Sequence, residues 1–174
     1  EVIEIISPRK SILVECPVRI NSLYFSEKIK NMRFSNSDLD ILISNFSEFR
    51  QLNCGLRIFI SRRDKNNSNS FARGLNKVKE IETFFKNQNF DIVFFEDLNF
   101  IQQIELCSKA NFIAGFHGAG LSNIIWANSG TKVIEITNSR FTEHFEHLSN
   151  ICGHEFSKIS IDANFSNLHK ILEN

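Results

Sequence analysis

The sequence lacks an excess of charge of either sign, a long hydrophobic run and closely spaced cysteine pairs. Twenty Lys and Arg residues balance twenty Asp and Glu residues among 174, which argues against a broad basic surface for nucleic acid or anionic lipid. No apolar run approaches the roughly 18 residues of a membrane-spanning helix, and no segment has the layout of a signal peptide. We expect no nucleic-acid partner and no membrane span, so any anion must be bound at a local site.

The four cysteines are spread along the chain without a CxxC pair. This spacing does not resemble the dense disulfide framework of small secreted domains. Reduced thiols in a cytoplasmic protein are the simpler interpretation, and a peripheral association with a membrane is left open. The chain begins with Glu1 rather than Met, so we expect it to be a fragment whose beginning is missing.

Short apolar runs rich in Ile, Val and Phe alternate with helical segments from about residue 54 onward. This alternation is typical of βα units around a parallel sheet. It predicts an α/β fold with a three-layer, Rossmann-like, doubly wound sheet. The expected strands are 56–60, 91–95, 111–115, 132–136 and 156–161, and the expected helices between and after them are 77–89, 100–110, 121–127, 141–151 and 165–172.

The first fifty residues show a weaker pattern. Residues 12–18 suggest a strand and residues 38–49 suggest a helix, but nothing there closes a second domain. We therefore interpret residues 1–52 as the remnant of an N-terminal or inter-domain region and residues 53–174 as the Rossmann-like domain. Residues 62–76 are polar and lack periodicity, which indicates a loop that leaves the first of these expected strands.

The stretch GFHGAGLSN, at 115–123, holds three of the seven glycines of the chain. It joins an expected strand to an expected helix, where free N–H groups attract anions. The small residues Gly118, Ala119 and Gly120 form its centre. Ser122 and Asn123 follow, and their side chains can bind a ligand or cap the helix. The stretch favours a diphosphate site, and a turn that merely permits close packing explains it equally well.

The order of these glycines argues against two common nucleotide motifs. From Gly115 the order is GxxGxG and not GxGxxG, and the lysine of a P-loop is missing. An NAD-dependent dehydrogenase and a Walker-type ATPase are therefore not favoured.

Charged residues follow or end two other strands of the expected sheet. Arg62 and Arg63 come directly after 56–60, and a guanidinium group suits bidentate phosphate contacts. Glu135 lies near the end of 132–136, where a carboxylate can accept hydrogen bonds from a sugar or ribose diol. Solvated arginines and a glutamate paired with a nearby lysine are the alternatives. The carboxyl ends of parallel strands meet at one edge, so we expect these groups to converge there.

The run ISRRD at 60–64, the Leu75–Asn76 pair and the segment 96–136 that contains HGAGLSN together resemble the glycosyltransferase family 61 domain, over about residues 54–137. That family occurs in bacterial polysaccharide biosynthesis and among eukaryotic xylosyl- and N-acetylglucosaminyltransferases. The resemblance implies an inverting enzyme of GT-B architecture, in which this chain is the carboxyl-terminal, donor-binding half. It also implies an acceptor domain that precedes this chain.

The resemblance assigns roles to the residues singled out above. Arg62 or Arg63 and the turn Gly118, Ala119, Gly120, Leu121, Ser122 and Asn123 are expected to hold the donor diphosphate. Glu135 is expected near the nucleoside or sugar. His117 is expected at the diphosphate or the anomeric centre, either as a base or as a phosphate donor, and a structural hydrogen bond is the alternative.

A second cluster of histidines suggests a metal site. His144, His147, Cys152 and His154 include two histidines three residues apart. The spacing matches no metalloprotease motif, and interleaved glutamates favour a solvated helix face. We expect no metal and no cofactor.

Together these features and the resemblance predict an inverting glycosyltransferase that transfers a sugar from a nucleotide-diphosphate donor to a glycan hydroxyl in capsular polysaccharide biosynthesis. The nucleotide expected in the donor is UDP. The alternative is a catalytically inert nucleotide-binding or interaction module, which is a truncated transferase half.

Overall fold

The computed structural model describes residues 36–62, 78–137, 143–160 and 172. All of them belong to one compact unit, Met32–Asn174. Five strands of the described residues form one sheet in the order β2-β1-β3-β4-β5, with every neighbouring pair parallel. The strands are β1 (Leu56–Ser61), β2 (Asp91–Phe94), β3 (Ala110–Phe116), β4 (Lys132–Thr137) and β5 (Glu155–Ser160).

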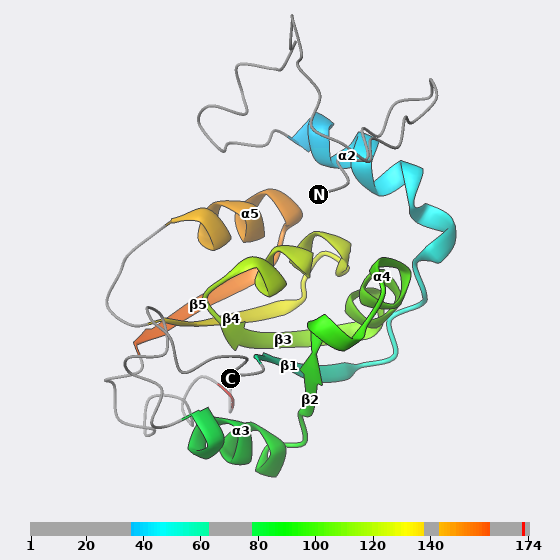
Figure 1. Ribbon diagram of the computed structural model, residues 1–174. Helices are drawn as coiled ribbons and strands as arrows, with labels where there is room; N and C mark the ends of the chain where they lie inside the picture. The colour runs from blue at the N-terminus through cyan, green and yellow to red at the C-terminus, as the bar shows by residue number, and fades with distance from the viewer. Residues whose placement is uncertain (1–35, 63–77, 138–142, 161–171, 173–174) are drawn as a thin grey trace, which may run out of the picture. The chain divides into compact units, whose positions relative to one another are not determined.

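Helices cover both faces of this sheet (Figure 1). The α-helices are α2 (Asn36–Asn45), α3 (Val78–Asn87), α4 (Phe100–Lys109) and α5 (His144–Cys152). The described residues also form the 3-10 helices η1 (Ser47–Phe49), η3 (Phe95–Asp97) and η4 (Ala119–Trp126). The predicted α/β fold, a three-layer Rossmann-like parallel sheet, is confirmed, because all five predicted strands occur in their expected places.

Successive residues of each strand point to opposite faces, which gives the sheet two separate cores. Ile58 and Ile60 belong to the core under α2, α4, η4 and α5. Phe59 lies between them and points to the core under α3. There its ring stacks on Phe85 with 4.5 Å between the ring centroids. Complete burial of one such side chain stabilises the folded state by about 1.5–3 kcal/mol. Strands that are apolar on both faces are therefore favoured only in a sheet that helices cover on both sides.

The strand order places a topological switch between β1 and β3. The sheet grows from β1 to β2 in one direction and from β3 through β4 to β5 in the other. The connections that leave the carboxyl ends of β1 and β3 therefore diverge to opposite sides and leave a crevice, where open α/β sheets bind ligands.

Some predicted boundaries are wrong for local reasons. The segment predicted as a helix at 121–127 is the 3-10 helix η4, which begins two residues earlier. Gly118 precedes it with φ 150° and ψ −176°, and the N–H of Leu121 donates to the Gly118 carbonyl at 2.9 Å. This hydrogen bond joins residues three apart in the sequence, which is the pattern of a 3-10 helix and not of an α-helix. Phe95 was predicted to end a strand, but pairing with β1 ends at Phe94 and η3 follows.

The helix predicted at 38–49 is divided into α2 and η1. Leu39 of α2 is only 4% exposed and belongs to the same core as the sheet. Phe46, between the two helices, packs edge-on against Trp126 with 5.5 Å between ring centroids. The strand predicted at 12–18 and all but Leu172 of the helix predicted at 165–172 lie outside the described residues. The division of the chain at residues 52 and 53 stays a prediction.

Candidate functional site

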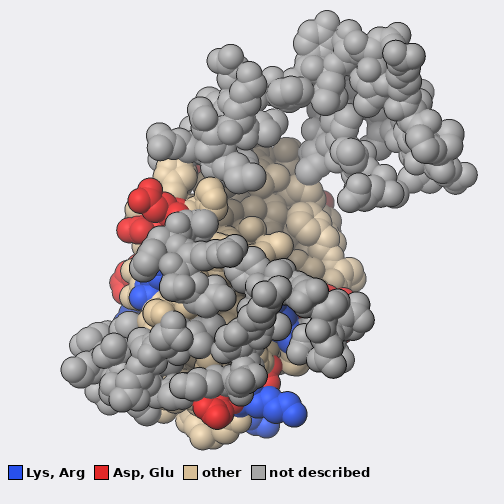
Figure 2. Space-filling model, turned by 60° about the vertical axis from the view of Figure 1, so that its left-hand side comes forward, with Lys and Arg blue, Asp and Glu red and all other residues tan. Residues whose placement is uncertain are grey.

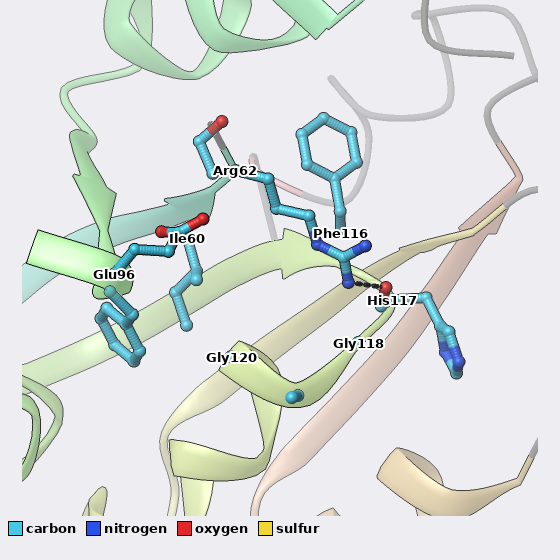
Figure 3. A pocket seen from close by; sticks show the side chains of 10 residues that line it. Ile60, Arg62, Glu96, Phe116, His117, Gly118 and Gly120 are labelled. Atoms are coloured by element: carbon cyan, nitrogen blue, oxygen red, sulfur yellow. Dashed lines mark hydrogen bonds between the residues drawn. The ribbon is translucent and has the colours of Figure 1, made fainter. Parts of the chain in front are cut away.

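A cavity of about 500 Å³ opens at the carboxyl ends of β1 and β3, at the switch point of the sheet. Three connections line it, and each one follows a neighbouring strand (Figure 3). The lining residues are Ile60, Ser61, Arg62, Phe95, Glu96, Phe116, His117, Gly118, Ala119 and Gly120. Residues far apart in the sequence meet here because parallel strands end at the same edge of the sheet.

Arg62 crosses the cavity from the end of β1 to the glycine-rich turn. Its Nη2 donates a hydrogen bond to the backbone carbonyl of His117, as the dashed line in Figure 3 shows. Burial lowers the pKa of Arg62 from its ordinary value, and the carboxylate of Glu96 acts against that shift. A guanidinium carries five N–H donors, and the described residues accept one of them. Arg62 is thus a fixed cation at the rim of the cavity.

Two glycines let the turn lie close to the end of β1, one against Arg62 and the other against Ile60. A Cβ at Gly118 would lie 1.5 Å from Nη2 of Arg62, and the φ of Gly118 disfavours other residues. A Cβ at Gly120 would lie 3.0 Å from Cγ2 of Ile60. The first N–H groups of a helix have no partner within it, and no described backbone acceptor contacts those of Ala119 and Gly120. The turn therefore presents N–H donors beside a guanidinium, an arrangement suited to an anion.

The remaining residues of the predicted turn lie elsewhere. Leu121 is fully buried in the core. Ser122 is exposed and does not line the cavity. The side-chain amide of Asn123 donates to the Gly120 carbonyl at 3.1 Å and so stabilises the turn. The cavity thus receives Gly118, Ala119 and Gly120 from the predicted set, but neither Ser122 nor Asn123.

His117 lines the cavity, but its ring points away from Arg62 in Figure 3. The ring packs edge-on against Phe145 of α5 with 5.2 Å between centroids. Its Nδ1 contacts Oε1 of Glu135. Glu135 is fully buried, and its Oε2 lies 3.6 Å from Nζ of Lys158 on β5. The carboxylate predicted to accept a diol thus contacts His117 through one oxygen, whereas its Oε2 makes no hydrogen bond within the described residues and lies only near the Lys158 ammonium. Its predicted role and that of His117 stay predictions.

Glu96 is a residue of this site that the sequence analysis missed. It is exposed, lines the cavity and lies in η3, directly after β2. The sequence could have indicated Glu96 by its position directly after the predicted strand 91–95, because the carboxyl ends of the strands line the site. The other predicted guanidinium, that of Arg63, lies outside the described residues.

The histidine cluster near α5 does not converge. His154 is buried, and its Nε2 lies 2.9 Å from the carbonyl oxygen of Ile124. His144 is exposed at the start of α5. Within the described ranges, no three His, Cys, Asp or Glu side chains are grouped as metal ligands. The solvated helix face predicted for these residues therefore holds for His144 but is wrong for His154.

Charges on the surface are mixed. In the face drawn in Figure 2, basic and acidic side chains of the described residues form small separate patches among uncharged residues. No helix among the described residues is long and apolar enough to cross a bilayer.

Comparisons with known proteins identify the family of this chain. The sequence model described as Glycosyltransferase 61 matches residues 3–134, well over half of the chain. A beta-1,2-xylosyltransferase of Oryza sativa subsp. japonica is 28% identical over 79 residues, which cover 45% of this chain and 15% of the rice protein. The chain thus aligns with a small part of that relative. By the extent of the family match, the chain belongs to the glycosyltransferase 61 family.

Proposed function

We propose that this chain binds the diphosphate of a nucleotide-sugar donor and serves as the donor-binding half of a glycosyltransferase. The observation that carries the proposal is the convergence of the Arg62 guanidinium and the N–H groups of the glycine-rich turn on one cavity. The cavity lies at the switch point, where α/β sheets bind nucleotides. The family supports transfer of a sugar as the reaction.

The chemistry of transfer supports a diphosphate at this place. When the anomeric bond breaks, negative charge develops on the departing diphosphate and must be stabilised. A guanidinium and backbone N–H groups supply that stabilisation without a metal ion. We extend the proposal to inversion at the anomeric carbon, GT-B architecture with a preceding acceptor domain, and a cytoplasmic role in polysaccharide biosynthesis.

Glu96 takes the part of the diol acceptor in this proposal. Its carboxylate is at the exposed rim of the cavity, whereas that of Glu135 is fully buried against His117 and Lys158. A carboxylate after the second strand of a nucleotide-binding sheet is well placed to accept hydrogen bonds from a ribose. The donor nucleoside would then extend from the turn toward η3.

Calorimetric titration with UDP, GDP and CDP tests the proposal. We expect saturable binding of one nucleotide, UDP by preference. Arg62→Ala should weaken it at least about tenfold, since a hydrogen bond to a charged group contributes roughly 1.5–3 kcal/mol. Lys86→Ala is the control with the same loss of charge, because Lys86 is exposed in the last turn of α3. Absence of binding by all three nucleotides, or equal loss in both variants, would contradict the proposal.

A further inference from the structure

Three neighbouring strands place a histidine, a glutamate and a lysine on the same side of the sheet. Glu135 of β4 pairs with Gly115 of β3 on one side and with Lys158 of β5 on the other. His117 lies two residues after Gly115, and its N–H donates to the Ile136 carbonyl at 2.8 Å. Since side chains alternate along strands, His117 and Glu135 point to the face that α5 covers.

In the row formed by His117, Glu135 and Lys158, the central carboxylate of Glu135 is more deeply buried than its two neighbours. Glu135 is 0% exposed, whereas the His117 side chain keeps 19% of its surface exposed and that of Lys158 keeps 17%. A buried carboxylate is costly unless partners satisfy it. Here Oε1 contacts Nδ1 of His117, and Oε2 lies 3.6 Å from the Lys158 ammonium. Among the described residues, Glu135 and Lys158 are the charged groups of this row, and α5 adds the ring of Phe145.

We propose that Glu135 is a positioning residue that holds His117 in the tautomer with the proton on Nδ1. A carboxylate can only accept a hydrogen bond, so the ring nitrogen that faces it must carry the proton. In the neutral imidazole the other nitrogen, Nε2, then has the lone pair. The tautomer of a histidine is set by the hydrogen bond that its other nitrogen makes, and here the ring is also held between Glu135 and Phe145.

With this tautomer, His117 can act as the base of the transfer reaction, and this role rests on the proposed function. An acceptor hydroxyl oxygen attacks the anomeric carbon, and the bond from that carbon to the diphosphate oxygen breaks. The electron pair leaves with the diphosphate toward Arg62, and the hydroxyl proton goes to Nε2 of His117. In Figure 3 the imidazole of His117 points away from Arg62, on the other side of the backbone of the turn. One short turn thus separates the leaving-group site from a base.

Imidazole NMR of the nitrogen-15-labelled 174-residue chain at about pH 8 tests the tautomer. Signals of His117 are assigned by their loss in His117→Gln. We expect a neutral ring with the proton on Nδ1 and an unprotonated Nε2. A ring protonated on Nε2, or on both nitrogens, overturns the proposal, and this measurement needs no change at Glu135.

Variants then test whether Glu135 is the cause. In Glu135→Gln the amide can either donate or accept, so we expect both tautomers of His117 to be populated. Glu135→Asp retains a carboxylate and should restore the Nδ1 tautomer at least in part, and Lys158→Met should leave it unchanged. The exposed His144 is the internal reference, because its signals should not respond. An unchanged His117 tautomer in folded Glu135→Gln overturns the assigned role of Glu135.

UDP titration of the same samples separates this inference from the proposed function. We expect Glu135→Gln to bind UDP within about threefold of the original chain, because Arg62 and the turn are retained. Loss of UDP binding with an Nδ1-protonated His117 would contradict the proposed function alone. UDP binding with an Nε2-protonated His117 would contradict this inference alone.

Discussion

The guanidinium of Arg62 lies directly against the backbone of Gly118, so that a Cβ at position 118 would be 1.5 Å from Nη2. The two residues come from the ends of different strands, β1 and β3, which are neighbours in the sheet. The contact explains why a glycine is required at this position in the turn. Under the proposed function, the glycine and the arginine are parts of one anion site, with consequences that can be measured.

Gly118→Ala should both strain the turn and displace Arg62. The backbone at φ +150° disfavours any side chain, and strain of this kind costs about 1–3 kcal/mol. We expect this loss in urea unfolding, together with at least about tenfold weaker UDP binding. Gly130→Ala is the matched control, since Gly130 has φ +82° and no atom within 4 Å of its Cβ position. It should lose stability but keep UDP affinity, and equal loss of affinity in both variants would refute a specific role for Gly118.

Glu96→Ala should reduce the preference for a nucleoside diphosphate over inorganic pyrophosphate. Removal of the carboxylate eliminates hydrogen bonds to a ribose and also reduces repulsion of phosphate, so the ratio of the two affinities is the informative quantity. We expect that ratio to fall about fivefold, which is roughly 1 kcal/mol. Asp97→Ala, at the next position, which is also exposed, should leave the ratio unchanged. A ratio that is the same in both variants would remove Glu96 from the nucleoside site.

Phe46→Ala should loosen the contact between the α2–η1 segment and the sheet. Phe46 packs on Phe100 and on Trp126, the single tryptophan of the chain. Because Phe46 is half-buried, we expect a loss of about 1–3 kcal/mol and a red shift of tryptophan emission. Leu52→Ala should change neither quantity, since Leu52 is 92% exposed. An unchanged emission spectrum in Phe46→Ala would show that residues 36–49 are not anchored there.

His154 should make stability fall in mild acid. Burial lowers the pKa of His154 below its ordinary 6.5, against the effect of its hydrogen bond to Ile124. The unfolded chain then binds the proton more readily, so this contribution is complete above about pH 6.5 and is lost as pH falls through that value toward the folded pKa. Unfolding measured between about pH 5 and 7.5 should show a flatter dependence in His154→Gln, and the slope should be unchanged in His144→Gln.

The cysteines should differ in reactivity. Cys54 is exposed, Cys107 is fully buried, and burial raises the pKa of Cys152 to about 11, with Arg50 acting in the opposite direction. Thiolates are the reactive form, so iodoacetamide at about pH 8 should label Cys54 at least about ten times faster than Cys107 and Cys152. Peptide mass spectrometry with and without urea checks this order. Rapid labelling of Cys107 in the folded chain would contradict its position in the core.

Hydrophobic patterning determined much of this fold. The runs LRIFI and KVIEI are apolar along almost their whole length, and such strands are stable only when helices cover both faces. Their alternation with amphipathic segments therefore predicted the parallel sheet and most helices. The 3-10 helix at 119–126 was predicted with the wrong type and start, because the conformation of Gly118 decides both and has no hydrophobic signature.

The sequence by itself determined which strand ends carry charged groups, and it predicted that any anion would be bound at a local site. Only the tertiary structure decided which of those groups meet. The parallel register brings Arg62 to Gly118 and Glu96 to the same rim, while the alternation of side chains along β4 turns Glu135 inward to His117 and Lys158. The physical reason is that a side chain's type is fixed by the sequence, whereas its partners depend on the register and face of strands far apart along the chain.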